Sequence, residues 1–247
     1  MTMVQVNGRV VETALIAFDK DGTLIDLHYL WGQKVRQWVD ALLAQVGESD
    51  ALESALYHSL GFDTVTNQVM AAGPLAITPL ANLYTVVSTV LYQHGLPWHK
   101  ATDLAETTAT ATMGTPPLLE QLNPIGDVMG TIQQLAAAGI KIGIVTSDDR
   151  APTELSLPLL GIQDAVDILI CGDDDLPHKP DPAGFHFLSQ KYNLDPSQMM
   201  MVGDTTNDML FGKNAGVACC VGIANGEQSG PAFADVVVSS IEAIQIV

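Results

Sequence analysis

Asp19 and Asp21 have the clearest chemical potential in this chain, because they follow an apolar run over residues 14–18 and precede a Gly-Thr pair. A β-strand keeps the side chains of residues i and i+2 on one face, so both carboxylates would share a site if extended geometry continues to Asp21. One carboxylate could then attack a substrate while the other transfers a proton. On its own, the segment also fits an ordinary acidic turn, so its meaning depends on the rest of the chain.

Two further segments could bind an anion. Thr146 and Ser147 follow the apolar run over residues 140–145, where hydroxyl and backbone N–H groups would donate hydrogen bonds. Lys179 lies in the segment Pro-His-Lys-Pro-Asp-Pro, and a fixed ammonium there would neutralise a carboxylate or a phosphoryl group. Taken alone, each segment is more typical of a structural strand end or an exposed loop.

A second pair of carboxylates follows the apolar run over residues 199–202. Asp204 comes after Gly203 at the end of this predicted strand, and Asp208 lies four residues later in the first turn of a predicted helix. Carboxylates placed in this way can hold a hard divalent cation directly or through water. The dipole of the helix would explain Asp208 alone, but a charge that ends a buried strand needs a partner.

The apolar runs before these residues indicate the fold, because they lack the alternation of a half-exposed strand. Such runs are typical of a parallel sheet that is covered on both faces. They span residues 14–18, 140–145, 168–170, 199–202, 217–221 and 236–238. Helical patterns cover residues 125–138, 182–192 and 207–214. This alternation predicts an α/β fold with a doubly wound parallel sheet, in which ligands bind at the carboxyl ends of strands.

Residues 29–115 break the alternation of strands and helices. Helical blocks are predicted there over residues 31–46, 50–60, 79–94 and 100–110. The sequence therefore predicts an α/β core formed by residues 1–28 and 116–247, with residues 29–115 inserted as a mostly helical unit. An Asn-Gly pair at residues 7–8 predicts a hairpin at the start of the chain.

The composition limits the class of protein. The chain has 247 residues, of which 47% are hydrophobic and 15% are charged, and this suits a large folded core. Its net charge of -18 would repel a phosphate backbone, so we expect no nucleic-acid partner. Cys171, Cys219 and Cys220 lie in or beside apolar runs and are expected to be buried free thiols. No segment has the pattern of a leader or a membrane span, so we expect a cytoplasmic protein without a membrane partner.

Together these segments resemble the motifs of the haloacid dehalogenase (HAD) superfamily of hydrolases, in its phosphatase branch. The matching residues are Asp19-Lys20-Asp21-Gly22-Thr23, Thr146, Lys179, Gly203-Asp204 and Asp208. The resemblance implies a Rossmann-like HAD core, and it places residues 29–115 where the family has an α-helical cap. The overall pattern is most similar to phosphatases of the phosphoglycolate type.

By this resemblance, the protein would hydrolyse a phosphomonoester of a small phosphorylated metabolite, with phosphoglycolate as the candidate substrate. Asp19 would be the nucleophile that forms an aspartyl-phosphate, and Asp21 would be the general acid and base. The phosphoryl group would be bound by Thr146, Ser147 and Lys179.

The resemblance also implies a Mg²⁺ cofactor. Its ligands would be the side chains of Asp19 and Asp204, the backbone carbonyl of Asp21, and Asp208 directly or through water. The predicted insert carries only Lys34, Arg36 and Lys100 as cations. A substrate with a second strong anion would need one of them or a group of backbone N–H donors, so heavily anionic substrates are disfavoured.

Two other functions remain open from the same residues. A sugar phosphomutase similar to β-phosphoglucomutase would pass the phosphoryl group to another hydroxyl. A binding or signalling module would instead use phosphorylated Asp19 as a switch. Asp21 argues against a dehalogenase, because dehalogenase members of the superfamily lack an acid at this position. The sequence leaves open whether the protein is a monomer or a homodimer.

Overall fold

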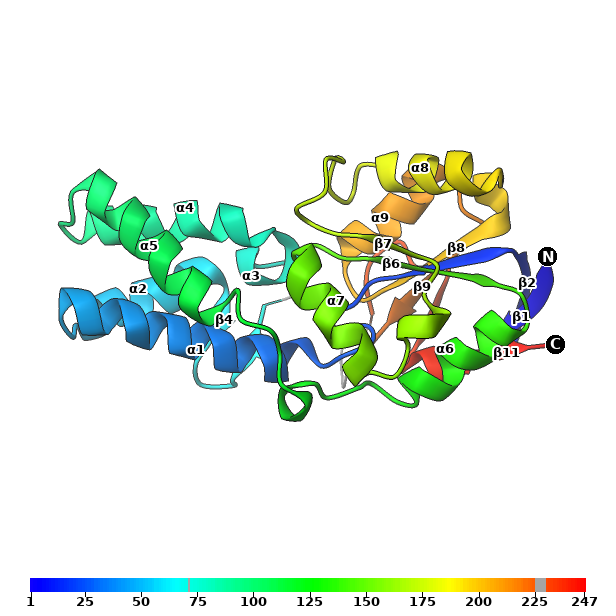
Figure 1. Cartoon of the computed structure of the whole chain (residues 1–247), viewed down its shortest axis with the longest axis horizontal. Helices are drawn as coiled ribbons and strands as arrows, with labels where there is room; N and C mark the ends of the chain where they lie inside the picture. Colours follow the sequence, from blue (N-terminus) through cyan, green and yellow to red (C-terminus); the bar gives the residue numbers. More distant parts are fainter. Residues whose placement is uncertain (71, 225–229) are drawn as a thin grey trace. The chain divides into compact units, whose positions relative to one another are not determined.

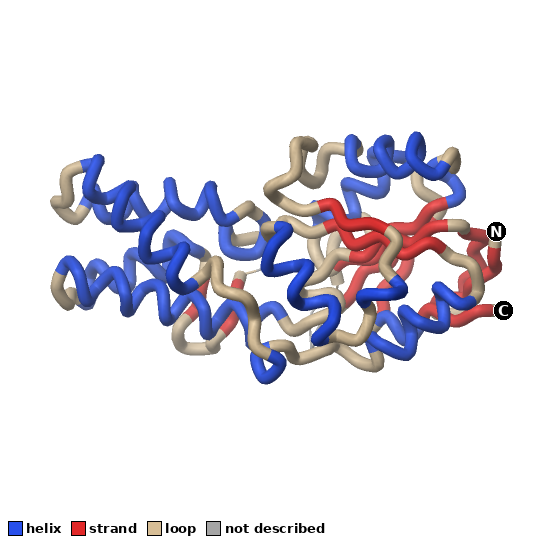
Figure 2. Tube along the Cα trace, in the orientation of Figure 1, coloured by secondary structure: helices blue, strands red, loops and turns tan. Residues whose placement is uncertain are grey.

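The computed structural model describes residues 1–70, 72–224 and 230–247, and it divides into two compact units (Figures 1 and 2). One of them, called the α/β unit, consists of Met1–Asp26 and Leu122–Val247. The other, called the helical unit, is Leu27–Gln121. The α/β unit contains all the residues to which the sequence analysis assigned chemistry.

The centre of the α/β unit is a parallel sheet that comprises, within the described residues, six strands in the order β10-β9-β8-β3-β6-β7. The strands are β3 (Leu15–Phe18), β6 (Lys141–Val145), β7 (Ile168–Ile170), β8 (Met199–Gly203), β9 (Cys219–Ile223) and β10 (Val236–Val238). Strand β3 lies between β6 and β8, with Phe18 beside Ile144 on one side and Val202 on the other. Because the strands are parallel, their carboxyl ends meet at one edge of the sheet.

Helices cover both faces of this sheet. They are α6 (Val128–Ala137), α7 (Arg150–Leu159), α8 (Ala183–Tyr192) and α9 (Thr206–Ala215), with short 3₁₀ helices at Gln163–Ala165, Pro196–Gln198 and Ile241–Ala243. In Figure 1, α8 and α9 lie on one side of the sheet and α6 lies on the other. Every residue of β3, β8 and β9 is buried. The predicted α/β fold with a doubly wound parallel sheet is therefore confirmed.

A small antiparallel sheet contains the start and the end of the chain. Its strands are β1 (Thr2–Val6), β2 (Arg9–Thr13) and β11 (Ile244–Ile246), in the order β11-β1-β2. Asn7 and Gly8 connect β1 to β2 with φ angles of 47° and 84°, as a two-residue hairpin turn of type I′ requires. The predicted hairpin is confirmed, whereas β11 was not predicted.

The helical unit is built mainly from antiparallel neighbours. Its helices are α1 (Leu27–Val46), α2 (Asp50–Leu60), α3 (Pro74–Ile77), α4 (Leu80–Gln93) and α5 (Trp98–Thr112), followed by a 3₁₀ helix at Leu119–Gln121. Helix α1 packs against α2 and α5, and α4 packs against α2 and α5. Two short strands that were not predicted, β4 (Phe62–Asp63) and β5 (Gln68–Val69), form a hairpin after α2.

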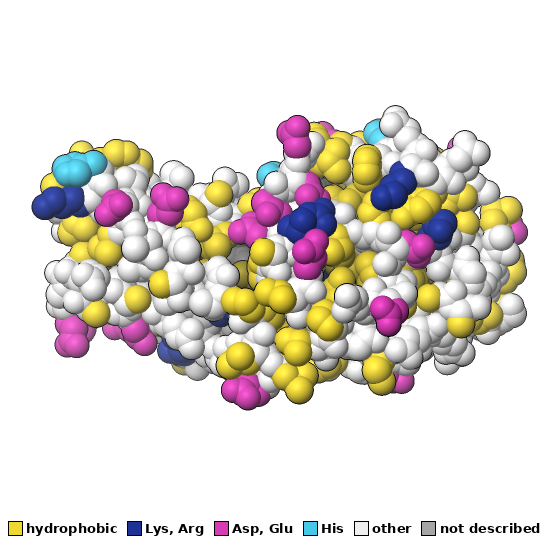
Figure 3. Space-filling view, in the orientation of Figure 1, with side chains coloured by type: hydrophobic (Ala, Val, Ile, Leu, Met, Phe, Trp, Pro, Cys, Tyr) yellow, Lys and Arg dark blue, Asp and Glu magenta, His cyan; other side chains and the backbone are white. Residues whose placement is uncertain are grey.

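The remaining expectations about composition concern cysteines, membranes and charge. Cys171, Cys219 and Cys220 are buried free thiols, as predicted. None of the described helices combines the length and the apolar composition that crossing a lipid bilayer requires. On the face drawn in Figure 3, the lysine and arginine side chains are scattered among hydrophobic, acidic and uncharged ones.

Trp38 holds three helices of the helical unit together, and this leads to a prediction about stability. Its indole N–H donates to Thr108 Oγ1 at 2.9 Å, its ring meets Tyr84 edge to face, and its side chain is fully buried. We expect Trp38→Phe to lower the free energy of unfolding by about 1–3 kcal/mol, because it leaves a cavity and removes the hydrogen bond that Thr108 Oγ1 accepts. Urea-induced unfolding measures the change. The same substitution at Trp98, which is 48% exposed, is the control and should cost less than about 0.5 kcal/mol.

Candidate active site

The chain leaves β3 and turns at once. The N–H of Asp19 still donates to the carbonyl of Val202 at 2.8 Å, which extends the pairing with β8 by one residue. The carbonyl of Lys20 then accepts the N–H groups of Thr23, Leu24 and Ile25. Gly22 has φ +89°, and a Cβ there would collide with the carboxylate of Asp204. The turn therefore requires glycine at this position, both for its backbone angle and for the approach of Asp204.

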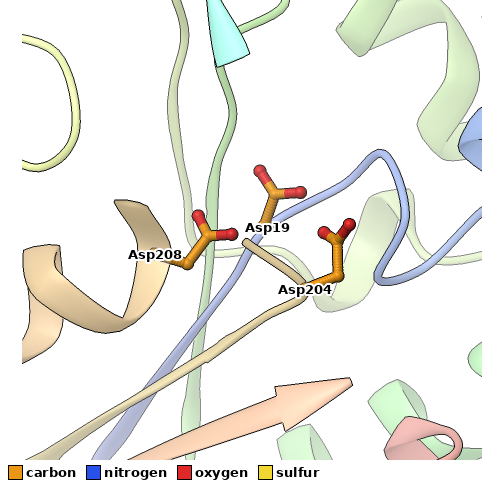
Figure 4. Close-up of side chains that lie close together, drawn as sticks. All are labelled: Asp19, Asp204 and Asp208. Carbon is orange, nitrogen blue, oxygen red and sulfur yellow. The ribbon is translucent and has the colours of Figure 1, made fainter. Parts of the chain in front are cut away.

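Three carboxylates from separate elements meet at the carboxyl edge of the sheet (Figure 4). Asp19 follows β3, Asp204 follows β8, and Asp208 lies in the first turn of α9. Each contributes an oxygen to a group in which all atoms lie within 4.8 Å of one another. Asp208 is fully buried, Asp19 is 6% exposed, and Thr23 Oγ1 donates to Asp204 Oδ1 at 3.1 Å. The sequence predicted Asp19 and Asp204 at strand ends and Asp208 in the first turn of a helix, and the structure brings them together.

Lys179 joins two of these carboxylates. Its Nζ lies 2.6 Å from Asp19 Oδ1 and 2.6 Å from Asp208 Oδ1, and it also donates to the carbonyl of Val145 at 3.1 Å. The other oxygen of Asp208 accepts the N–H and the hydroxyl of Thr205, at 2.9 and 2.6 Å. Thr205 in turn caps α9. Asp208 is thus fixed by the start of its own helix and presents its free edge to the lysine.

The burial of so many charges shifts their pKa values. Burial, together with the charge of Asp208, raises the pKa of Asp19 to about 7 against the opposing effect of Lys179. Burial and the charges of Asp19 and Asp208 likewise hold the pKa of Asp204 well above its ordinary value. Burial alone would lower the pKa of Lys179, but the charges of Asp19 and Asp208 outweigh it and raise that pKa.

This arrangement fits a hard divalent cation. The three carboxylates offer oxygen ligands only, which is the donor set that Mg²⁺ prefers. They also carry more negative charge than the single ammonium of Lys179 neutralises, and this excess contributes to the raised pKa values of Asp19 and Asp204. A cation among them would remove that repulsion.

Thr146 and Ser147 lie at the carboxyl end of β6. The N–H of Thr146 donates to the carbonyl of Ile170 at 2.9 Å, so Thr146 continues the pairing of β6 with β7. Thr146 is buried and Ser147 is half-buried. Both line a cavity of about 20 Å³ together with Lys179, which comes from the loop after β7. The structure thus brings the three predicted anion-binding residues to one place.

Asp21 lies apart from the group of three carboxylates. Its Oδ1 and Oδ2 accept hydrogen bonds from Lys20 Nζ at 2.8 and 2.7 Å, and Lys20 also contacts Asp148 Oδ2 at 3.1 Å. The Lys20 side chain is only 2% exposed. No role was predicted for Lys20 or Asp148 from the sequence. A signal was present, because a lysine between two aspartates is unusual in a chain with only 10 lysine and arginine residues.

The raised pKa of Asp19 predicts a pH-dependent stability for the metal-free protein. The folded state binds the proton of Asp19 more tightly than the unfolded state, so the stability from this group is lost as the pH rises from about 4 to about 7. The side chain of Asp19→Asn does not titrate in this range, so the variant does not show this decrease in stability. In the presence of a chelator, we expect the free energy of unfolding to shift in favour of the variant by about 2–4 kcal/mol between pH 4 and pH 8.

Asp63→Asn provides a control of opposite sign for this measurement. The N–H groups of Val65 and Thr66 donate to the Asp63 carboxylate and lower its pKa, so its stabilising effect is present at high pH and lost as the pH falls. The free energy of unfolding of the wild type should therefore increase relative to that of Asp63→Asn as the pH rises. A shift of the same sign in both variants would contradict the proposed origin of the effect.

Comparisons with known proteins identify the family of the chain. The model of the haloacid dehalogenase-like hydrolase family matches residues 13–216. A phosphoglycolate phosphatase of Yersinia pestis is 32% identical over 228 residues, which cover 89% of this chain and 84% of that protein. A pyrophosphatase PpaX of Bacillus velezensis is 38% identical over 89 residues, which cover 36% of this chain and 41% of that protein.

A solved structure shows that the fold is shared as well. The crystal structure of a HAD phosphatase from Thermococcus onnurineus superposes with a TM-score of 0.65 and 23% identity, covering 93% of this chain and 95% of that one. The chain therefore belongs to the haloacid dehalogenase-like hydrolase family, as its motifs predicted, and the protein is a hydrolase.

Proposed function

We propose that this protein is a Mg²⁺-dependent phosphomonoesterase that hydrolyses a small phosphorylated metabolite through an aspartyl-phosphate on Asp19. The observation that carries the proposal is the position of Lys179, whose ammonium bridges Asp19 and Asp208 at the carboxyl edge of the sheet. A carboxylate can attack an anionic phosphoryl group only where positive charge offsets their repulsion. Lys179, whose side chain is 8% exposed, supplies part of that charge.

Asp19 would attack phosphorus, and the ester bond to the leaving oxygen would break. The contact between Lys179 Nζ and Asp19 Oδ1 orients the carboxylate, leaving its other oxygen for attack. Thr146 and Ser147 line the same cavity as Lys179, so their hydroxyl and N–H groups would hold the oxygens of the phosphoryl group. Water would then hydrolyse the aspartyl-phosphate and release inorganic phosphate.

Asp21 would transfer the proton. It would protonate the leaving oxygen in the first displacement and take a proton from the attacking water in the second. Its carboxyl group lies on the turn after Asp19, which brings it near the nucleophile without placing it among the three clustered carboxylates.

The proposed cofactor would be held by Asp19, Asp204, Asp208 and the backbone carbonyl of Asp21. When bound, Mg²⁺ would neutralise charge that develops on the phosphoryl oxygens. The chain prepares this site with the turn at Gly22, which lets Asp204 approach, and with Thr205, which fixes Asp208.

The substrate class rests on similarity. The phosphoglycolate phosphatase of Yersinia pestis is similar over most of both chains, and phosphoglycolate is the first substrate to test. The helical unit would act as the cap that selects the leaving group, in keeping with its low content of cations. Lys34 is buried and donates to the carbonyls of Met113 and Thr115, so its charge serves the structure of the helical unit.

A panel of phosphomonoesters tests the proposal. We expect the wild type to release phosphate from at least one small ester, phosphoglycolate included, and only with Mg²⁺ present. Asp19→Asn should reduce turnover by at least about 10³-fold, because the amide cannot form the covalent intermediate. Asp103→Asn, on the exposed face of α5, is the matched control and should keep full activity. Absence of phosphate release from every ester by the wild type would overturn the proposal.

Metal binding gives a second prediction that does not depend on knowing the substrate. We expect Mg²⁺ to raise the thermal unfolding temperature of the wild type by several degrees, since it binds only the folded state. Asp204→Asn should abolish this shift, because it removes one of the three clustered carboxylates. Asp63→Asn should keep it. An equal shift in wild type and Asp204→Asn would place the metal elsewhere.

A further inference from the structure

Lys20 is a buried ammonium whose partners are both carboxylates. It binds the two oxygens of Asp21 at 2.8 and 2.7 Å and Oδ2 of Asp148 at 3.1 Å. The side chain is therefore held on two sides by opposite charge.

Asp148 is anchored to the sheet independently of Lys20. Its N–H donates to Thr146 Oγ1 at 3.1 Å, and its Oδ1 accepts the N–H of Asp149 at 2.9 Å. Its carbonyl accepts the N–H of Gly172 from the loop after β7 at 2.8 Å. A Cβ at Gly172 would collide with the carbonyl of Ser147, so glycine allows these two loops to pack this closely. Asp148 is thus a fixed point at the carboxyl ends of β6 and β7.

The three side chains form a continuous connection from β6 to the turn after β3. Asp148 fixes Lys20, and Lys20 contacts both oxygens of Asp21, which restrains the rotation of that carboxyl group. The Asp21 side chain is 12% exposed and the Asp148 side chain is 9% exposed, so solvent screens these contacts only weakly. A proton donor must lie within hydrogen-bond reach of the atom it serves, and an error of about 1 Å can cost about 10²-fold in rate.

We propose that Lys20 and Asp148 are positioning residues that orient the carboxyl group of Asp21 toward the leaving oxygen of the substrate. This inference rests on the proposed function, in which Asp21 exchanges a proton with that oxygen. Neither Lys20 nor Asp148 touches the reacting atoms. The side chains of Lys20 and Asp148 would therefore act on the reaction through the carboxyl group of Asp21, and this property distinguishes their effect from a purely structural role.

The test compares two esters that differ in their need for a proton. An alkyl ester (2-phosphoglycolate, or the best alkyl ester of the panel) has a poor leaving group, whereas p-nitrophenyl phosphate has one that departs without protonation. Asp21→Asn defines the effect of losing the proton donor. We expect Lys20→Met to reduce kcat about 10- to 100-fold for the alkyl ester and less than about 3-fold for p-nitrophenyl phosphate, with KM little changed.

Double variants show whether Lys20 acts through Asp21. In the Asp21→Asn background, Lys20→Met should lower kcat for the alkyl ester by less than about 3-fold further, because there is no proton donor left to orient. Lys20→Arg retains the charge and should recover part of the activity. Lys141→Met is the matched control: this lysine pairs with Asp167 at the opposite end of β6, and its loss should leave both activities unchanged.

Removal of Lys20 leaves two buried carboxylates facing each other, so the double variant Lys20→Met/Asp148→Asn takes the place of Lys20→Met if the single variant does not fold. The double variant should show the same dependence on the leaving group. Equal losses for the two esters, or no loss for either, would overturn the positioning role while leaving the phosphatase function intact. A wild type that hydrolyses neither ester would instead overturn the proposed function and this inference with it.

Discussion

The concentration of negative charge at one edge of the parallel sheet is the constraint on which the rest of the site depends. Asp19, Asp204 and Asp208 are brought within 4.8 Å of one another by the ends of two adjacent strands and one helix. Such a group is costly to bury, because desolvation and mutual repulsion both disfavour the charged forms. Two features offset this cost. Lys179 lies between Asp19 and Asp208, and the carboxylates offer only oxygen donors, which suit a cation. The same edge contains a second carboxylate pair, Asp21 and Asp148, which Lys20 joins. Two buried lysines thus organise two neighbouring groups of acids.

Backbone details explain how these groups approach so closely. Gly22 has a positive φ and no side chain where the carboxylate of Asp204 lies, and Gly203 leaves room for the side chain of Asp208. The hydrogen bonds between Thr205 and Asp208 satisfy the first turn of α9 and fix the carboxylate at the same time. The residues that shape the backbone at this edge of the sheet therefore also position the carboxylates. A side chain at either glycine would collide with one of these acids.

The sequence was most informative where local pattern and tertiary environment agree. The buried parallel strands were predictable because unbroken apolar runs of this length are typical of strands covered on both faces, and the first hairpin was predictable because Asn7 and Gly8 suit its turn. Helix α7 was not predicted, since Pro158 lies inside it and prolines are typical of loops rather than of helix interiors. Strand β11 is only Ile244–Ile246, and it depends on pairing with β1 at the other end of the chain. The residues at strand ends were identified by type and spacing. The partnership of Lys20 with Asp148 depends on how the loops after β3 and β6 pack, which spacing does not reveal.

Charge also bears on the substrate that the proposed function would accept. The helical unit has three cations, Lys34, Arg36 and Lys100. Lys34 is committed to backbone carbonyls, and Arg36 donates to Asn67 and lies over the ring of Phe62. A leaving group with several negative charges would thus find little compensating charge in the helical unit, while its acids would repel it. The phosphoryl group differs, because under the proposed function Lys179 and the cation of the α/β unit would offset its charge. It follows that the site should favour esters in which the transferred phosphoryl group carries most of the charge, and a small monoester such as phosphoglycolate meets this condition better than a polyphosphate does.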